Sequence, residues 1–156
     1  MTVSLDCIRN AARAVIIRDD HILLLRKDGD GLGERYALPG GAQELGETLE
    51  ISLQRECLEE IGTQVEVLSL LHVADYFKPR DTIPPSTRQL IEFLFLCDVP
   101  QDYQPTNGSR PDKHQVAVAW MELERLPSIK LQPRKLSELL RTPGQTLMPG
   151  YLGVID

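Results

Sequence analysis

Three glutamates recur at helical spacing near the middle of the chain. Glu56 is followed by Glu59 and Glu60, and positions three and four apart share one face of an α-helix. Carboxylates so close together repel one another, so a cation is needed to offset their charge. Hard oxygen ligands favour Mg²⁺ or Mn²⁺. The spacing therefore predicts a divalent-metal site, with a merely solvated acidic helix face as the alternative.

The acids belong to a longer pattern, GAQELGETLEISLQRECLEEIGT, which covers residues 41–63. This segment resembles the Nudix box, G-x5-E-x7-R-E-U-x-E-E-x-G-U, in which U is a bulky aliphatic residue. The fixed positions of the box match at Gly41, Glu47, Arg55, Glu56, Glu59, Glu60 and Gly62. Cys57 and Thr63 occupy the two U positions, and both departures concern packing rather than metal ligation.

The resemblance implies an enzyme that hydrolyses phosphoanhydrides with Mg²⁺ or Mn²⁺ as cofactor. The implied metal ligands are Glu56, Glu59, Glu60 and the backbone carbonyl of Gly41. Glu47 is expected to ligate the metal or to order the loop before the helix. Arg55 is expected to orient the acids through ion pairs, with direct contact to a substrate phosphate as the alternative. Because no Ser, Cys or His stands in a recognisable nucleophile setting, water is the expected attacking group.

Candidates for the general base lie both inside and outside the box. They are a box glutamate, Glu92, Asp112 or His114. Arginines at strand ends could meet substrate phosphates, namely Arg9, Arg13 and Arg26. Tyr76 and Phe77 could stack on a base, although aromatic residues at a strand end commonly belong to the core.

Apolar periodicity and turn residues predict the elements that position these side chains. Strands are expected at 14–17, 21–25, 36–38, 65–76, 90–98 and 115–121, the first two forming a hairpin. Helices are expected at 47–61 and 133–140, and long loops at 77–87 and 100–113. This order predicts an α/β fold of the α+β type. The resemblance implies an α/β/α sandwich with a mixed sheet and a central catalytic helix.

Length, composition and charge indicate the domain count, the location and the partners of the protein. The 156 residues predict a single domain, residues 1–156. A net charge of -6 disfavours stable binding to nucleic acid. An odd number of cysteines and an N-terminus unlike a signal peptide predict a cytoplasmic protein, and no apolar run is long enough for a membrane span. The expected partner is a small nucleotide substrate, and a homodimer is left open.

The expected reaction is cleavage of the pyrophosphate bond in a nucleoside diphosphate linked to a second group. Pro79 follows the box at a distance that resembles a feature of ADP-ribose-cleaving members, which favours ADP-ribose or a nucleotide sugar. Two alternatives stay open. One is a nucleoside triphosphate pyrophosphatase, and the other is a catalytically silent Nudix fold that binds a nucleotide as a regulator.

Overall fold

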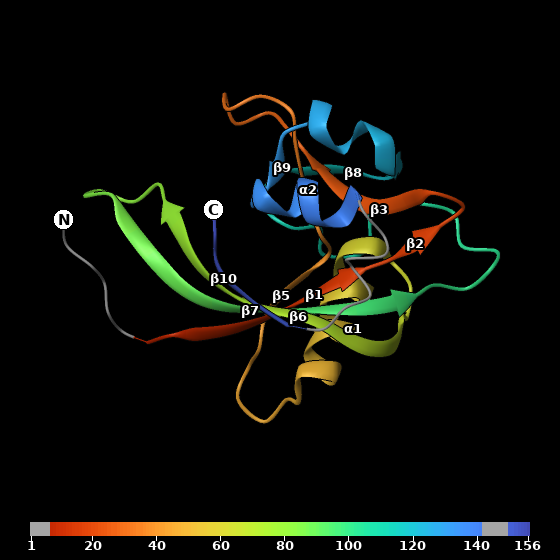
Figure 1. Cartoon of the computed structure of the whole chain (residues 1–156), viewed down its shortest axis with the longest axis horizontal. Helices are drawn as coiled ribbons and strands as arrows, with labels where there is room; N and C mark the ends of the chain where they lie inside the picture. The colour runs from red at the N-terminus through yellow and green to blue at the C-terminus, as the bar shows by residue number, and fades with distance from the viewer. Residues whose placement is uncertain (1–6, 142–149) are drawn as a thin grey trace.

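The computed structural model describes residues 7–141 and 150–156, which form two β-sheets with helices packed against them (Figure 1). The strands are β1 (Arg9–Val15), β2 (Ile17–Arg18), β3 (His21–Lys27), β4 (Arg35–Ala37), β5 (Gly40–Ala42), β6 (Glu66–Arg80), β7 (Ser86–Asp98), β8 (Gln115–Glu122), β9 (Leu131–Gln132) and β10 (Gly150–Ile155). The helices are α1 (Leu49–Ile61), the 3₁₀ helix η1 (Leu123–Ser128) and α2 (Lys135–Arg141).

Both sheets are mixed, and the predicted α+β class is confirmed. The first sheet has the order β10-β6-β7-β1-β5, in which β1 runs parallel to β7 and antiparallel to β5. The second sheet has the order β2-β3-β4-β9, and β8 pairs with β3. The sequence predicted one mixed sheet. It missed the division because a sequence pattern does not show which strands pair.

Helix α1 has clear start and stop signals. Thr48 caps its first turn by accepting a hydrogen bond from the Ile51 N–H. Gly62 ends it in the left-handed conformation, with a φ of 72°. The helix therefore begins slightly later than the predicted 47–61. Its apolar stripe packs into a core between α1 and the sheets, through Leu53, Cys57 and Ile61, each 0% exposed. This anchoring leaves the acidic face free to point at β5.

The predicted hairpin of 14–17 with 21–25 is only partly correct. The tight turn is present, and Asp19 and Asp20 both adopt a positive φ. Only the two residues of β2 pair with β3, however. The preceding residues belong to β1, which lies in the other sheet between β7 and β5. One continuous apolar run thus serves two sheets.

The predicted loop at 77–87 is wrong. Strand β6 continues to Arg80 and β7 begins at Ser86, so only a short turn joins them. Cross-strand pairs extend through this segment, with Pro79 opposite Thr87. Figure 1 shows β6 and β7 extending as a long two-stranded arm beyond the rest of the sheet. Three prolines suggested a loop, but pairing with the neighbouring strand outweighs their local effect here.

The remaining predictions vary in accuracy. Strand 115–121 is confirmed as β8, and the second helix is confirmed at 135–141, two residues after Pro133. The short strands β5, β9 and β10 and the helix η1 were not predicted, because two to six residues carry little periodic signal. In the part of the chain that the structure describes, no helix is long and apolar enough to cross a membrane.

Candidate active site

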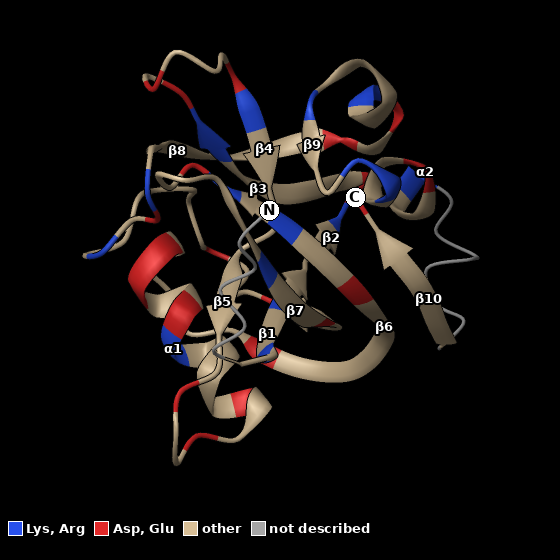
Figure 2. Ribbon diagram, turned by 90° about the vertical axis from the view of Figure 1, so that its left-hand side faces the viewer, with Lys and Arg blue, Asp and Glu red and all other residues tan. Residues whose placement is uncertain are grey.

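Arg55 on α1 joins the acids of the box. Its Nε and one terminal nitrogen donate to the Glu47 carboxylate at 2.6 and 2.9 Å. Its other terminal nitrogen lies 3.0 Å from Glu56 Oε1 and 3.5 Å from Glu59 Oε2. The hydrogen bond with Glu47 is the main cause that raises the pKa of Arg55 and lowers the pKa of Glu47. One guanidinium thus contacts three of the four box carboxylates, which gather on and beside α1 (Figure 2).

Glu60 points inward from the same helix and is 2% exposed. Its carboxylate accepts a hydrogen bond from the Gly40 N–H at 2.7 Å. Burial, followed by the negative charge of Asp112, raises the pKa of Glu60 to about 8. Burial also raises the pKa of Glu56, in spite of its contact with Arg55. Both carboxylates therefore lie where more positive charge is needed to stabilise their ionised forms.

Strand β5 approaches these acids closely because it is built from glycine. A Cβ on Gly41 would lie 2.6 Å from the carboxyl carbon of Glu56. A Cβ on Gly40 would lie 2.0 Å from the Ala12 carbonyl oxygen, and Gly40 also has a φ of +135°. A side chain at either position would displace its neighbour. The two glycines thus bring backbone groups of β5 next to the carboxylates.

The donor set fits a divalent cation. Glu56, Glu59 and Glu60 offer hard oxygen atoms, and the Gly41 backbone lies against Glu56. The half-buried Glu56 and the buried Glu60 also need positive charge to stabilise their ionised forms. Within residues 7–141 and 150–156, no three acidic, histidine or cysteine side chains already form a metal-binding cluster. In this arrangement Arg55 binds Glu56 and Glu59 instead.

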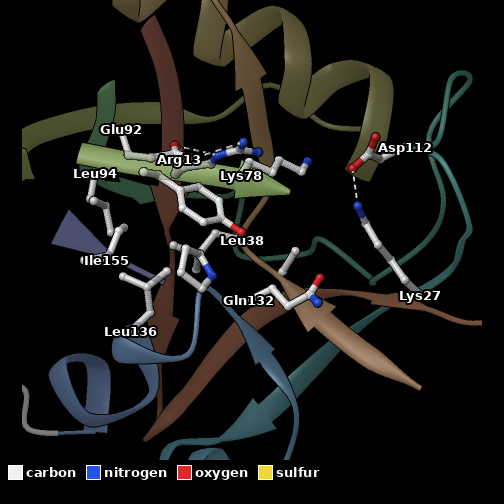
Figure 3. Close-up of a pocket in the computed structure, with 13 residues that line it drawn as sticks. Arg13, Lys27, Leu38, Lys78, Glu92, Leu94, Asp112, Gln132, Leu136 and Ile155 are labelled. Carbon is white, nitrogen blue, oxygen red and sulfur yellow. Dashed lines mark hydrogen bonds and ion pairs between the residues drawn. The ribbon is translucent and has the colours of Figure 1, made fainter. Parts of the chain in front are cut away.

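Two cavities adjoin the acids and share part of their walls. The first, which we call the acidic cavity, is lined by Ala11, Arg13, Gly40, Gly41, Ala42, Glu56, Glu60, Lys78, Arg88, Leu90 and Asp112. The second, the mixed cavity, is lined by Arg13, Lys27, Ala37, Leu38, Tyr76, Lys78, Glu92, Leu94, Asp112, Gln132, Pro133, Leu136 and Ile155 (Figure 3). Arg13, Lys78 and Asp112 belong to both, so the cavities are neighbours.

Two residues that line both cavities, Arg13 and Asp112, form ion pairs. Arg13 donates to both oxygens of Glu92, at 2.9 and 3.3 Å, and to the Gly40 carbonyl at 2.9 Å. Lys27 Nζ lies 2.5 Å from Asp112 Oδ2, as the dashed line in Figure 3 marks. Burial alone would raise the pKa of Asp112, but Lys27 outweighs it and the pKa is lowered. Asp112 is therefore anionic at neutral pH.

Lys78 differs from these cations. Figure 3 places its side chain beside Arg13 at the rim of the mixed cavity. In the described part of the chain it has no ion pair at salt-bridge distance. Burial, followed by the positive charges of Arg13 and Lys27, lowers its pKa. The junction of the two cavities thus presents positive charge on one side and the carboxylates of α1 on the other.

The segment from Pro100 to Gln115 holds the end of α1. The Gly108 and Arg110 N–H groups donate to the carbonyls of Glu60 and Glu59, at 3.0 and 2.9 Å. The Gln115 side-chain amide donates to the Glu60 carbonyl at 2.8 Å. A Cβ on Gly108 would lie only 2.3 Å from the Glu59 carbonyl oxygen. The segment was predicted as a loop, and its observed contacts position the helix that carries the acids.

Most of the predicted site residues come together. The two cavities are lined by Gly41, Glu56, Glu60, Arg13, Tyr76, Glu92 and Asp112. Glu47 and Glu59 connect to them through Arg55. Arg26 and His114 do not line either cavity. Arg26 pairs with Glu34 at 3.2 Å, and His114 lies 3.7 Å from Asp30.

Four polar or charged cavity residues were not singled out from the sequence. They are Lys27, Lys78, Arg88 and Gln132. Strand alternation could have found Lys78, because it shares a face with Tyr76 two positions earlier. No local signal could have found Gln132, since it reaches the cavity from a two-residue strand near α2.

Known proteins resemble this chain in sequence and fold. The family model described as NUDIX domain matches residues 8–141. A "MutT-like protein" of Streptomyces ambofaciens is 32% identical over 72% of this chain and 62% of its own length. An "ADP-ribose pyrophosphatase" of Methanocaldococcus jannaschii is 38% identical over 57% of this chain and 50% of its own. A crystal structure of UDP-X diphosphatase superposes with a TM-score of 0.67 at 24% identity, over 95% of this chain and 68% of that one.

The similarities to known proteins differ in what they show about this chain. The structural match lies below 25% identity, so it shows the fold alone. The chain spans between half and two thirds of the length of the two curated relatives. The family model, in contrast, extends over most of the chain and includes the whole acidic helix with its bracketing glycines. The chain therefore belongs to the Nudix hydrolase family.

Proposed function

We propose that this protein hydrolyses a phosphoanhydride bond in a nucleoside diphosphate linked to a second group, with Mg²⁺ or Mn²⁺ as cofactor. One observation carries the proposal. The acidic cavity has the α1 carboxylates Glu56 and Glu60 on one wall and the β6 and β7 cations Lys78 and Arg88 on another. Opposed walls of this kind suit a diphosphate bound through a metal ion on one side and directly on the other.

The residues have distinct tasks in this proposal. Glu56, Glu59, Glu60 and the Gly41 carbonyl would hold the metal, which when bound polarises the phosphate and acidifies the attacking water. Arg55 orients the acids through its contacts with Glu47, Glu56 and Glu59.

Lys78 and Arg88 face the cavity and would neutralise phosphate oxygens. Among the proposed general bases, Glu92 is committed to Arg13 and His114 lies outside both cavities. Asp112 is likewise paired with Lys27, so a box glutamate is the better candidate.

The mixed cavity supports a substrate with a sizeable second half. Its wall combines apolar side chains with the phenol of Tyr76 and the amide of Gln132, which suits a base or a sugar. The archaeal relative named for ADP-ribose cleavage agrees with ADP-ribose or a nucleotide sugar. Pro79, the sequence feature that favours ADP-ribose, lies in the strand pair of β6 and β7, opposite Thr87. A nucleoside triphosphate pyrophosphatase is the second candidate, favoured by the positive charge around Arg88.

A substrate panel tests the proposal. ADP-ribose, nucleotide sugars, dinucleotides and the common nucleoside triphosphates are compared by kcat/KM at one Mg²⁺ concentration. We expect ADP-ribose or a nucleotide sugar to be preferred, with ¹⁸O from water appearing in a phosphate product. A tenfold preference for a triphosphate would select the second candidate. No turnover of any substrate, together with tight nucleotide binding, would favour a silent regulator.

A further inference from the structure

Four basic residues line up on one face of the first sheet. Lys78 and Arg88 are direct cross-strand partners on β6 and β7, and both line the acidic cavity. Strand side chains alternate between faces, so Arg80 lies on the same face of β6 as Lys78. Arg9 lies on the same face of β1 as Ala11, which lines that cavity too. The register of β1 with β7 is continuous here and pairs Arg9 with Leu90.

These charges are close to one another and are not neutralised. Burial lowers the pKa of Arg88, and the positive charges of Arg80 and Arg9 lower it further. Among the described residues, the salt bridges involve none of the four. Like charges opposite each other on paired strands are destabilising. A chain with a net charge of -6 has ample acidic residues to pair with them, so an anionic ligand explains the arrangement better than folding does.

The position of the group indicates which anion. Lys78 stands at the junction of the two cavities. From there Arg88 faces the acidic cavity, Arg80 follows on β6 in the arm, and Arg9 lies at the start of β1 beside β7. A substrate with its nucleoside in the mixed cavity and its reacting diphosphate beside Glu56 would point its far end at these two arginines.

We propose that Arg80 and Arg9, together with Arg88, bind a phosphate group of the substrate that lies outside the cleaved diphosphate. This proposal rests on the proposed function and predicts that, within its substrate class, compounds with a further phosphate on the distal side are favoured over their counterparts without it. Two sources share that chemistry, a third phosphate in the chain or a phosphate on the second group. Arginine suits either, because its planar fork binds phosphate oxygens in pairs.

Binding of inorganic tripolyphosphate and pyrophosphate to the full chain, measured by calorimetry in EDTA, tests the arginines without catalysis. We expect the wild type to bind tripolyphosphate at least tenfold more tightly than pyrophosphate. The double variant Arg9→Ala/Arg80→Ala should lose this difference, and Arg9→Lys/Arg80→Lys should keep part of it. The measurement needs neither metal nor turnover, so its result does not depend on the catalytic proposal. Arg125→Ala, exposed on η1, is the matched control.

Two results of the binding measurement would overturn the proposal. One is an unchanged preference for tripolyphosphate in the alanine double variant, and the other is an equal loss in Arg125→Ala. A melting temperature lowered by the double substitution would also contradict it, because it would show a structural task for the arginines.

A kinetic comparison separates the two sources. Two substrate pairs are compared, ATP with ADP, and ADP-ribose with and without a phosphate on its distal ribose. For each pair, the kcat/KM of the substrate with the extra phosphate is divided by that of the substrate without it, in the wild type and in Arg9→Ala/Arg80→Ala. The pair whose ratio falls tenfold in the double variant identifies where the phosphate lies. If neither ratio falls, the arginines do not bind substrate.

Discussion

Glu60 is a fully buried carboxyl group, and because its ionised form is unfavourable there without a cation, its presence indicates function rather than stability. Its carboxylate is 2% exposed and receives a hydrogen bond from the Gly40 N–H. Arg13, a nearby cation, is already paired with Glu92. A buried carboxylate without a dedicated partner is expensive in free energy. The proposed metal cofactor would supply the missing positive charge.

Glu60→Gln should separate activity from stability. The amide keeps the shape and the bond from Gly40 but removes the charge. We expect kcat to fall at least a hundredfold, about 3 kcal/mol in barrier at ~1.4 kcal/mol per tenfold. The melting temperature should stay the same or rise, because the amide has no ionised form whose burial is unfavourable. Glu124→Gln, in the first turn of η1 and exposed, serves as control. A near wild-type kcat would show that Glu60 is not a ligand.

Asp30 is the residue whose protonation should cost stability in acid. Its two carboxylate oxygens accept hydrogen bonds from Arg35 at 2.9 and 2.6 Å. These bonds lower the pKa of Asp30 from 3.8 to about 2. A depressed pKa means that the contribution to stability is complete above pH 3.8 and is lost as the pH falls toward 2.

The urea midpoint, measured from pH 6 to pH 2, checks this prediction. We expect the wild type to lose stability more steeply between pH 4 and pH 2 than Asp30→Asn, which is less stable at pH 6. Parallel curves for the two proteins would contradict the assignment of this pair.

At the scale of elements, the site depends on hydrogen bonds from the loop before β8, and from the first residue of β8, to the C-terminal end of α1. Helix ends leave carbonyl groups without intrahelical partners, and here Gly108, Arg110 and Gln115 supply donors to Glu59 and Glu60. Glu59 and Glu60, whose side chains we propose as metal ligands, thus have their backbone carbonyls fixed from outside the helix. Small shifts of the loop would move both carboxylates.

Gly108→Ala should weaken the hydrogen bonds that hold the end of α1. The new Cβ would lie 2.3 Å from the Glu59 carbonyl oxygen, and backbone cannot yield as a side chain can. We expect a loss of roughly 1–3 kcal/mol in the free energy of unfolding, the usual range for overpacking, and a lower kcat. Chemical denaturation and steady-state kinetics measure both effects. Gly150→Ala, whose Cβ would meet nothing within 4 Å, is the control, and equal effects in both variants would refute the role of Gly108.

Sequence patterns predicted the elements whose signals are local. The box gave α1, its acids and its bracketing glycines, because helical spacing and caps lie within a few residues. The prediction for 77–87 was wrong because its prolines suggest a loop, whereas pairing between β6 and β7 makes most of the segment part of two strands. Lys78 and Gln132 were missed for a related reason. Their place at the mixed cavity depends on how strands from separate parts of the chain pack, which no local pattern contains.

At the scale of the whole molecule, metal binding and folding should be linked. The acids of α1 repel one another in the absence of the ion, and Arg55 offsets only part of that charge. A ligand that binds the folded state alone stabilises it by about 2.7 kcal/mol at a hundredfold excess over Kd. For a protein of this size, each kcal/mol corresponds to roughly 2–4 °C in Tm.

Mg²⁺ should therefore raise the Tm of the wild type by several degrees, and EDTA should reverse the shift and abolish turnover. Glu56→Gln and Glu60→Gln should each reduce the shift, because each removes one ligand charge. Ca²⁺ titrations in parallel distinguish a selective site from general screening, and NaCl at equal ionic strength is the control for screening. If the chelated protein hydrolysed its best substrate at the full rate, or if NaCl reproduced the whole shift, the carboxylates of α1 would not constitute a metal site.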